Sequence, residues 1–308
     1  MSNKKSEIFA YLCLIGAVSL WGGNWVAVRY VVQEIPPFVV VTTRTVLSAI
    51  ILLLIMNLRK DPRPSIKEYK LYAFFGLVGL FGFNICQFVG LKFTTATNGS
   101  LINAITPMLV ILFSRFLIKE RLSIVQIAGA LISFFGVTWI VTKGSWAVVS
   151  SLQFNLGDVL MFIGSVCWAI YTVLSKKPTL QYSAVSVTAY SSVFAALYFL
   201  PFGVAQYQAE PLVAVPSWKI IMSMSFIVFV AVCGIIAWTK GISLIGPNRG
   251  SIFMNLMPIF TVIFAFLILK EPISLYQLLG GVFVLIGVLL TTNPQMIWKL
   301  KFSTSTTE

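Results

Sequence analysis

The sequence predicts an all-α polytopic membrane protein with ten transmembrane helices, arranged as two five-helix repeats of inverted topology. Three observations support this fold class: the apolar composition, an internal repeat and the distribution of basic residues. The 308 residues are 58% hydrophobic and only 10% charged, with a mean hydropathy of +0.93. Soluble domains carry roughly 25% charged residues, so we expect most of this chain to lie in the lipid bilayer.

Ten apolar segments are long enough to cross a bilayer, because a transmembrane helix needs about 20 apolar residues. The connections between them are short and leave no room for a soluble domain. The segments lie near residues 8–28, 37–56, 71–91, 97–117, 122–141, 156–175, 183–204, 219–239, 250–269 and 274–292. We expect one five-helix repeat over 8–141 and a second over 156–292, with short cytoplasmic tails at 1–7 and 293–308.

A stretch of 47 residues, 90–136, matches residues 241–287 without a gap. Most of the eleven identities are Gly, Pro or charged residues, which an apolar composition alone does not produce. The identical residues of the first copy are Gly90, Gly99, Ser100, Pro107, Phe113, Lys119, Glu120, Ser123, Gln126, Gly129 and Gly136. We infer that an ancestral unit was duplicated. Because each unit has five spans, the second enters the membrane from the opposite side, as in many secondary transporters.

The basic residues are distributed unevenly between the two sides of the membrane. With the N-terminus in the cytoplasm, sixteen Lys and Arg fall inside, five fall outside and Arg44 lies within a span. This asymmetry predicts a multi-pass protein of the cell (inner) membrane with both termini cytoplasmic. A net charge of +13 would suggest a nucleic-acid partner for a soluble protein. Here topology accounts for the charge, so we expect no nucleic-acid partner.

The first span carries Trp21, Gly22, Gly23 and Asn24. At 1.5 Å per residue, Trp21 lies roughly 20 Å from the start of its helix, past the membrane midplane. Tryptophan is usually found at the membrane interface, so this depth favours a cavity wall. The alternative is a packing site at which the glycines admit a neighbouring helix.

Arg44 lies in the second span, about seven residues from its outer end. A charged side chain within a span is costly and usually functional, but a long stem can also carry the guanidinium to the headgroups. Two interpretations stay open: snorkelling or structural pairing, and direct contact with a substrate.

The third and fourth spans contain polar side chains. Asn84 and Gln87 are three residues apart and share a helix face; they could form interhelical hydrogen bonds or line a cavity. In the fourth span Pro107 displaces the carbonyl four residues earlier, which belongs to Asn103.

In the copy, Pro258 does the same beside Asn255. Matching proline-broken helices are a strong sequence indication of a binding site at the midplane.

The second half supplies further aromatic residues. Trp168 lies at about the depth of Trp21, and Tyr171 follows one turn later. Trp238 ends the eighth span, either as an interface anchor or at the inner end of a pathway. Near the outer end of the sixth span, Asp158 suits the N-terminus of a helix.

The last helix of each half begins with a capping-box pattern. Ser123 with Gln126 and Ser274 with Gln277 have the spacing at which each side chain bonds the other residue's backbone. These two helices are rich in Leu, Ile and Val, so we expect them to face lipid or a second subunit. A homodimer therefore stays open.

Several of these motifs resemble the drug/metabolite transporter superfamily, and more narrowly its members with two EamA repeats. The resemblance rests on residues 20–25 with Arg29, on Pro36 and Pro37 with Arg44, and on the Pro, Lys-Glu, Ser, Gln, Gly, Gly series of both halves. It covers nearly the whole chain and is weaker in spans six to eight. It implies ten spans, cytoplasmic termini, a central cavity between the halves, and efflux of small metabolites such as amino acids.

The leading hypothesis is a secondary transporter that exports a small amphipathic metabolite by alternating access. Aromatic side chains would hold its apolar part, and amides would hold its polar head. The residues expected to contact it are Trp21, Asn24, Asn84, Gln87, Asn103, Trp168, Tyr171, Trp238 and Asn255.

Other mechanisms fit the sequence less well. The chain has no His, and none of its nine acids lies in the middle of a span, so uniport or exchange is favoured over proton antiport. It has no phosphate-binding G-x-x-x-x-G-K-[ST] loop, which argues against ATP-driven transport. Without His, a Ser–His dyad and a His-ligated metal are excluded, and no aspartate-rich motif replaces them, so we expect no catalytic residue, metal or cofactor. A channel-like facilitator for small solutes is the alternative.

Overall fold

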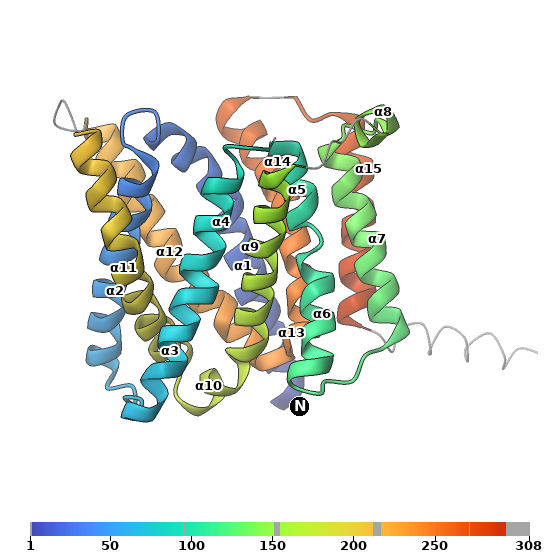
Figure 1. Ribbon diagram of the computed structural model, residues 1–308. Helices are drawn as coiled ribbons and strands as arrows, with labels where there is room; N and C mark the ends of the chain where they lie inside the picture. Colours follow the sequence, from blue (N-terminus) through green and yellow to red (C-terminus); the bar gives the residue numbers. More distant parts are fainter. Residues whose placement is uncertain (1, 95, 151–154, 212–216, 271, 294–308) are drawn as a thin grey trace, which may run out of the picture.

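The protein is a bundle of α-helices in the computed structural model, which describes residues 2–94, 96–150, 155–211, 217–270 and 272–293. Those ranges contain no β-strand. Within them, ten helical spans are long and apolar enough to cross a membrane, as the sequence predicted. Figure 1 shows the spans running roughly parallel, with the N-terminus at the bottom of the view. We call the side that holds the N-terminus the N-terminal face and the other side the opposite face.

Each half consists of five spans, some of them divided into shorter helices. The first half comprises α1 (Ser2–Val31), α2 (Pro37–Arg59), η1 (Ile66–Glu68), α3 (Tyr69–Phe75), η2 (Gly76–Gly82), α4 (Phe83–Gly90), α5 (Ala96–Asn103), α6 (Thr106–Leu117) and α7 (Ile124–Val141). The short α8 (Trp146–Ser150) follows. The second half comprises α9 (Leu156–Leu174), α10 (Lys176–Gln181), α11 (Ala184–Ala209), α12 (Trp218–Ile245), α13 (Pro247–Gly250), η3 (Ser251–Leu256), α14 (Met257–Leu269) and α15 (Leu275–Thr292).

The first helix already begins at Ser2, so most of the predicted N-terminal tail is helical. Residues 294–308 of the predicted C-terminal tail lie outside the described ranges.

Contacts between the halves occur twice, with partners exchanged. Gly90 lies against Gly157 and Met161, and its copy Gly241 lies against Ala10 and Leu14. The α1 residues precede their α9 counterparts by 147 positions. The first helix of each half therefore crosses the third span of the other half in the same way, which is what a two-fold axis between inverted halves produces.

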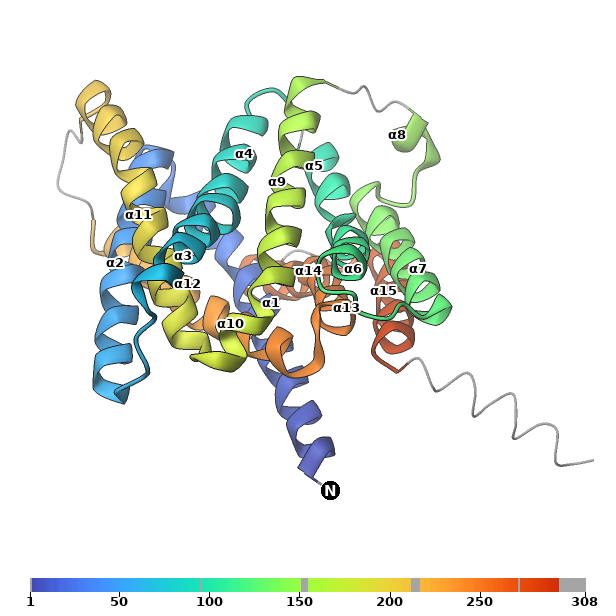
Figure 2. The same ribbon diagram turned by 60° about the horizontal axis from the view of Figure 1, so that its bottom comes forward.

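The last helices of the two halves, α7 and α15, pack along each other at one edge of the bundle (Figures 1 and 2). Gly136 faces Gly280, and Gly129 faces Gly287. Glycines two turns apart lie on one helix face and let the backbones approach closely. The glycine-bearing faces of these helices contact the other half of the same chain. Their exposed faces carry large apolar residues such as Leu131 and Leu285, and contact of these faces with lipid or a second subunit stays a prediction.

Both of these helices begin with the predicted capping box. The backbone N–H of Ser123 donates to Gln126 Oε1 at 3.1 Å, and that of Ser274 donates to Gln277 Oε1 at 2.8 Å. These bonds satisfy donors that a helix start leaves open, so the two loops have the same structural explanation.

The fourth and ninth spans are irregular just before their prolines. α5 ends at Asn103, and α6 begins at Thr106 with Pro107 in its second position. In the copy, η3 is a 3-10 helix that gives way to α14 at Met257, with Pro258 again second. Proline lacks the N–H that would continue the preceding helix.

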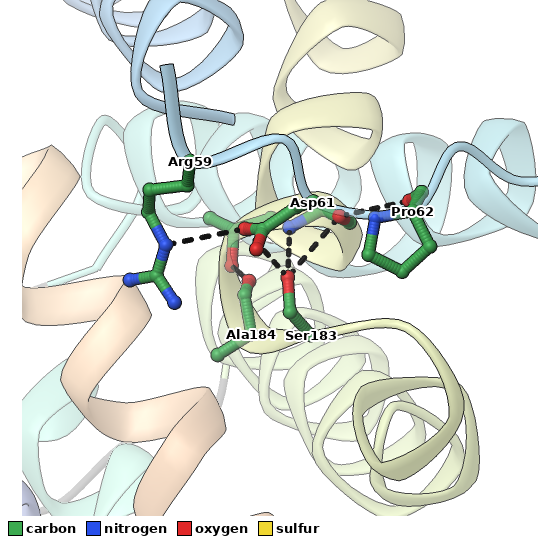
Figure 3. Close-up of polar contacts among 7 residues, drawn as sticks. Arg59, Asp61, Pro62, Ser183 and Ala184 are labelled. Atoms are coloured by element: carbon green, nitrogen blue, oxygen red, sulfur yellow. Dashed lines mark hydrogen bonds and ion pairs between the residues drawn. The ribbon is translucent and has the colours of Figure 1, made fainter. Parts of the chain in front are cut away.

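The loop after α2 is bound to the start of α11 on the N-terminal face (Figure 3). The Ser183 hydroxyl donates to Asp61 Oδ2 at 3.1 Å, and Arg59 Nε lies 3.4 Å from the same oxygen. Nearby, the Tyr182 hydroxyl donates to Glu68 Oε2. These contacts fasten the first half to the second.

Candidate functional site

Three tryptophans from three different spans meet in the interior of the bundle. The ring centroid of Trp21 in α1 lies 5.6 Å from that of Trp168 in α9 and 5.4 Å from that of Trp238 in α12. Trp168 and Trp238 are 6.2 Å apart, and Phe83 of α4 lies 5.2 Å from Trp168. We call these four residues the tryptophan cluster. It joins the first helix and the third span of both halves.

An aromatic chain leads from this cluster towards the N-terminal face. Tyr171 lies 5.5 Å from Trp168 and 5.7 Å from Phe75. The ring of Tyr72 continues the chain, with its centroid 6.2 Å from that of Phe75 and 5.6 Å from that of Tyr190. Each ring belongs to a different turn or helix, so the chain crosses from the centre of α9 to α3 and α11.

A polar layer lies one helical turn from the tryptophan cluster towards the opposite face. Gln87 and Asn103 exchange two side-chain hydrogen bonds, of 2.8 Å and 3.0 Å, and Ser165 donates to Asn103 Oδ1 at 3.0 Å. Gln87 follows Phe83 by one turn of α4, and Ser165 precedes Trp168 by one turn of α9. We call Gln87, Asn103 and Ser165 the polar bridge.

The two halves place opposite chemistry at equivalent positions. With the offsets of 151 and 147 residues, Gln87, Asn103 and Ser165 correspond to Trp238, Met254 and Val18. The latter three belong to or pack against one hydrophobic core cluster. The interior is therefore polar where α4, α5 and α9 meet and apolar at the equivalent position between α12, η3 and α1.

A second polar contact lies beside the bridge. Arg44 of α2 donates to Asn84 Oδ1 at 3.1 Å, and Asn84 Nδ2 donates to the Leu80 carbonyl at 2.6 Å. Asn84 lies between Phe83 and Gln87 in the first turns of α4, so one short stretch of this helix carries the Arg44 contact, a ring of the tryptophan cluster and a residue of the polar bridge.

Several buried polar atoms around the cluster make no hydrogen bond to any described residue. They are Trp168 Nε1, Trp238 Nε1 and Asn24 Oδ1. The buried hydroxyls of Tyr171 and Thr239 interact with each other. Native proteins rarely leave buried polar groups unpaired, because each lost partner costs about 1–3 kcal/mol. Unpaired donors and acceptors inside an aromatic lining are groups that a polar ligand could satisfy.

The expected site residues do not all meet. Trp21, Trp168, Tyr171 and Trp238 share one aromatic network, and Gln87 and Asn103 bond each other beside it. Asn255 is directed elsewhere: its Nδ2 donates to Ser133 Oγ of α7 at 2.9 Å. Asn24 lies one turn beyond Trp21 on α1.

Sequence reasoning missed Phe83, Ser165 and Thr239. Phe83 stands four residues before the predicted Gln87, and Ser165 stands three residues before the predicted Trp168, so each lies one helical turn away. Helical spacing could have found them. Thr239 had no comparable signal apart from its place next to Trp238.

Equivalent polar contacts close both ends of the central helices. On the N-terminal face, Arg249 bonds Glu7 Oε1 at 2.9 Å and the Tyr11 hydroxyl at 2.7 Å. On the opposite face, Asp158 accepts from Thr94 and, at 3.5 Å, from Asn98 Nδ2. Asn98 and Arg249 are 151 residues apart, whereas Tyr11 and Asp158 are 147 apart. The same two positions thus hold each end.

Two small cavities lie away from the tryptophan cluster. One is lined by residues of α7 and α8 that include Trp139 and Trp146. The other, of about 160 Å³, lies between α14 and the start of α15 beside Thr261 and Gln277.

Comparison with known proteins decides the family. The model of the EamA-like transporter family matches residues 8–142 and 155–293. The chain belongs to the EamA-like transporter family. It is 32% identical to the uncharacterized transporter YyaM of Bacillus subtilis, over 91% of this chain and 92% of that one. An uncharacterized transporter of Archaeoglobus fulgidus is 29% identical over 95% of this chain and 99% of its own length.

The EamA-like fold is also found among solved structures. One crystal structure superposes with a TM-score of 0.75, covering 94% of this chain and 96% of the other, at 17% sequence identity. At that identity the likeness concerns the fold alone. The protein is thus a multi-pass membrane transporter with two EamA repeats.

Proposed function

We propose that this chain is a secondary transporter of the cell membrane that exports a small amphipathic metabolite, such as an amino acid, by alternating access. The observation that carries the proposal is the tryptophan cluster with its unpaired buried polar atoms, enclosed between two inverted halves. Aromatic rings offer an apolar lining, and a few converging polar groups fix a ligand's orientation.

The asymmetry between the halves supports an amphipathic substrate. A polar head would contact the polar bridge, while an apolar side chain would lie against Trp238 and the core around Met254. A purely polar or purely apolar solute would leave one side of such a site unmatched, at the cost of unpaired polar groups or exposed apolar surface.

The equivalent contacts at the two ends support alternating access. The Arg249 and Asp158 contacts occupy matching positions and close opposite faces. Because the halves are related by a pseudo-two-fold axis, opening one end costs about as much as opening the other. The excess of basic residues on the side of the N-terminus supports a cytoplasmic location for both termini.

The proposed transport mode is uniport or substrate exchange, without coupling to protons. The polar bridge consists of amides and a hydroxyl, which do not titrate in the physiological range. Proton coupling usually relies on a carboxylate or His within the spans, and all nine acids stand near span ends or in loops.

Counterflow in proteoliposomes tests the function. Vesicles preloaded with one apolar amino acid at a time should accumulate the labelled compound in a saturable manner. Trp168→Ala should abolish this accumulation, whereas Trp218→Ala, at an exposed tryptophan near the start of α12, should not. Linear, non-saturable uptake would instead favour a channel, and no uptake of any amino acid would contradict the substrate class.

A further inference from the structure

Arg44 keeps its charge inside the membrane-spanning part of the molecule. It stands seven residues after Pro37, about 10 Å along α2. Its partner Asn84 stands six residues before Gly90, about 9 Å from the same end of α4. The guanidinium therefore extends sideways to the neighbouring span and does not reach towards the headgroups. This geometry contradicts the interpretation that Arg44 snorkels to the headgroups.

The charge of Arg44 is not neutralised by the described part of the chain. The ion pairs found there join Arg59 to Asp61, Lys176 to Glu120 and Arg249 to Glu7, and none involves Arg44. A guanidinium has five N–H donors, and its described side-chain partner is one neutral amide oxygen. A cation within a span normally pairs with an anion or carbonyls, because leaving it unpaired in low dielectric is costly.

Asn84 holds the guanidinium in place. Its Nδ2 donates to the Leu80 carbonyl one turn earlier at 2.6 Å, which aims its Oδ1 at Arg44. The amide cannot supply a negative charge. It is a positioning residue that fixes a cation against the stretch of α4 that also carries Phe83 and Gln87.

The fold itself does not need this cation. The corresponding helix of the second half, α11, contains no Lys or Arg. Ile235 stands 151 residues after Asn84 and is buried in the main hydrophobic core cluster. A structural pairing required by the two-fold architecture would be expected in both halves.

We infer that Arg44 binds the carboxylate of the transported metabolite, while the apolar part of the same molecule contacts the tryptophan cluster. The inference rests on the proposed function and narrows it to small carboxylates with a branched or aromatic apolar group. A charge-assisted, two-pronged bond between guanidinium and carboxylate would supply the missing anion. Asn84, which holds this group, stands on α4 between Phe83 of the tryptophan cluster and Gln87 of the polar bridge.

Thermal unfolding of the detergent-purified protein tests the inference without knowledge of the natural substrate. The probes are isovalerate and isovaleramide, which share size and shape and differ in charge, with KCl matching the ionic strength. Isovalerate should raise the unfolding midpoint and isovaleramide should not. In Arg44→Gln the concentration giving half of that stabilisation should rise about tenfold or more, and Arg44→Lys should lie between.

The matched control is Arg63→Gln, because Arg63 also donates to an asparagine, Asn57, but on the surface. It should respond to isovalerate like the wild type. Equal stabilisation by acid and amide, no stabilisation by either, or an unchanged response of Arg44→Gln would overturn the inference. Even if Arg44→Gln does not fold, the comparison of isovalerate with isovaleramide on the wild type shows whether the protein binds a carboxylate selectively.

Counterflow separates this inference from the proposed function. Amino-acid counterflow that persists unchanged in Arg44→Gln would overturn the role of Arg44 and leave the function standing. Absence of counterflow in the wild type, together with stabilisation by isovalerate alone, would contradict the proposed transport and support the carboxylate contact.

Discussion

Gly136 of α7 and Gly280 of α15 face each other so closely that neither could carry a side chain without displacement. A Cβ on Gly136 would lie 2.6 Å from the Gly280 carbonyl oxygen, and one on Gly280 would lie 2.7 Å from that of Gly136. In the repeat, Gly136 corresponds to Gly287 and Gly280 to Gly129. The second contact, Gly129 with Gly287, is therefore the same contact seen from the other half.

Gly280→Ala should destabilise the protein through this contact. Overpacking a tight interface typically costs about 1–3 kcal/mol, which thermal unfolding in detergent would detect as a lower midpoint. The neighbouring Gly281→Ala is the control, because its Cβ would lie 3.9 Å from Ile259 Cδ1, an ordinary contact. Equal effects of the two substitutions would show that helix propensity, and not the close approach, governs this position.

The polar bridge predicts that stability and transport respond differently to paired substitutions. Gln87→Leu or Asn103→Leu alone leaves the other amide with fewer partners in a buried site, at a cost of about 1–3 kcal/mol. The double variant removes both amides and should recover part of that loss. Transport should stay impaired in all three, because the polar contact with the substrate is absent.

Thermal midpoints of the single and double variants test the predicted stability, and their counterflow rates test the predicted loss of transport. A double variant that transports like the wild type would reduce the bridge to a structural link between α4, α5 and α9.

Composition and the internal repeat were sufficient to predict the ten spans and the inverted topology of the two halves. Apolar length determines where a helix can cross lipid, and the series from Gly90 to Gly136 with its copy determines the symmetry. The partners of each helix could not be derived in this way. Gly129 and Gly136 indicate a close approach, but any helix with small residues would satisfy them, so their contact with α15 came from the structure.

The site shows the same limit at the level of side chains. The matched depths of Trp21 and Trp168 were visible in the sequence, but contact between their rings depends on how α1 and α9 cross. Asn255 was expected at the site because it stands beside the ninth span's break, and helix rotation directs it to Ser133 instead. The π-helical turn η2, which brings Gly79 against Tyr171, had no signal beyond three glycines at intervals of three.

Tyr182 and Glu68 predict a pH-dependent part of the stability. The hydrogen bond from the Tyr182 hydroxyl, followed by bonds from Ser65, holds the pKa of Glu68 below its ordinary value of 4.5. A depressed carboxyl pKa contributes stability that is fully present above the ordinary value and is lost as the pH falls through the lowered one. Tyr182→Phe should therefore lower the unfolding midpoint at neutral pH, and the difference from the wild type should disappear in acid.

The control for this pH prediction is Tyr207→Phe, at an exposed tyrosine of α11, which should match the wild type throughout. A Tyr182→Phe deficit that persists unchanged well below pH 4.5 would mean that the hydroxyl acts through another contact, such as the bond that it accepts from Gln181 Nε2 at 3.4 Å, and not through the Glu68 carboxylate.

The end contacts predict that each face can be loosened separately. Asp158→Asn weakens the contacts with Thr94 and Asn98, and Glu7→Gln removes the ion pair with Arg249. Cys86 and Cys167 are partly buried within α4 and α9, and Cys13 lies in the N-terminal half of α1. Labelling these native thiols with a membrane-impermeant maleimide, added from one side of the membrane at a time, reports which face has opened.

Asp158→Asn should speed labelling of Cys86 and Cys167 from the opposite face, and Glu7→Gln should speed labelling of Cys13 from the N-terminal face. Each amide keeps an oxygen that can accept one hydrogen bond, so both variants should still fold. Glu210→Gln, at an acid near the end of α11 that bonds only Gln206 of its own helix among the described residues, controls for the loss of one charge on the opposite face. If both variants increase labelling equally from both faces, the contacts stabilise the bundle generally and do not act as separate closures. If the increase is confined to one face in each, each contact closes its own face, as alternation between inverted halves requires.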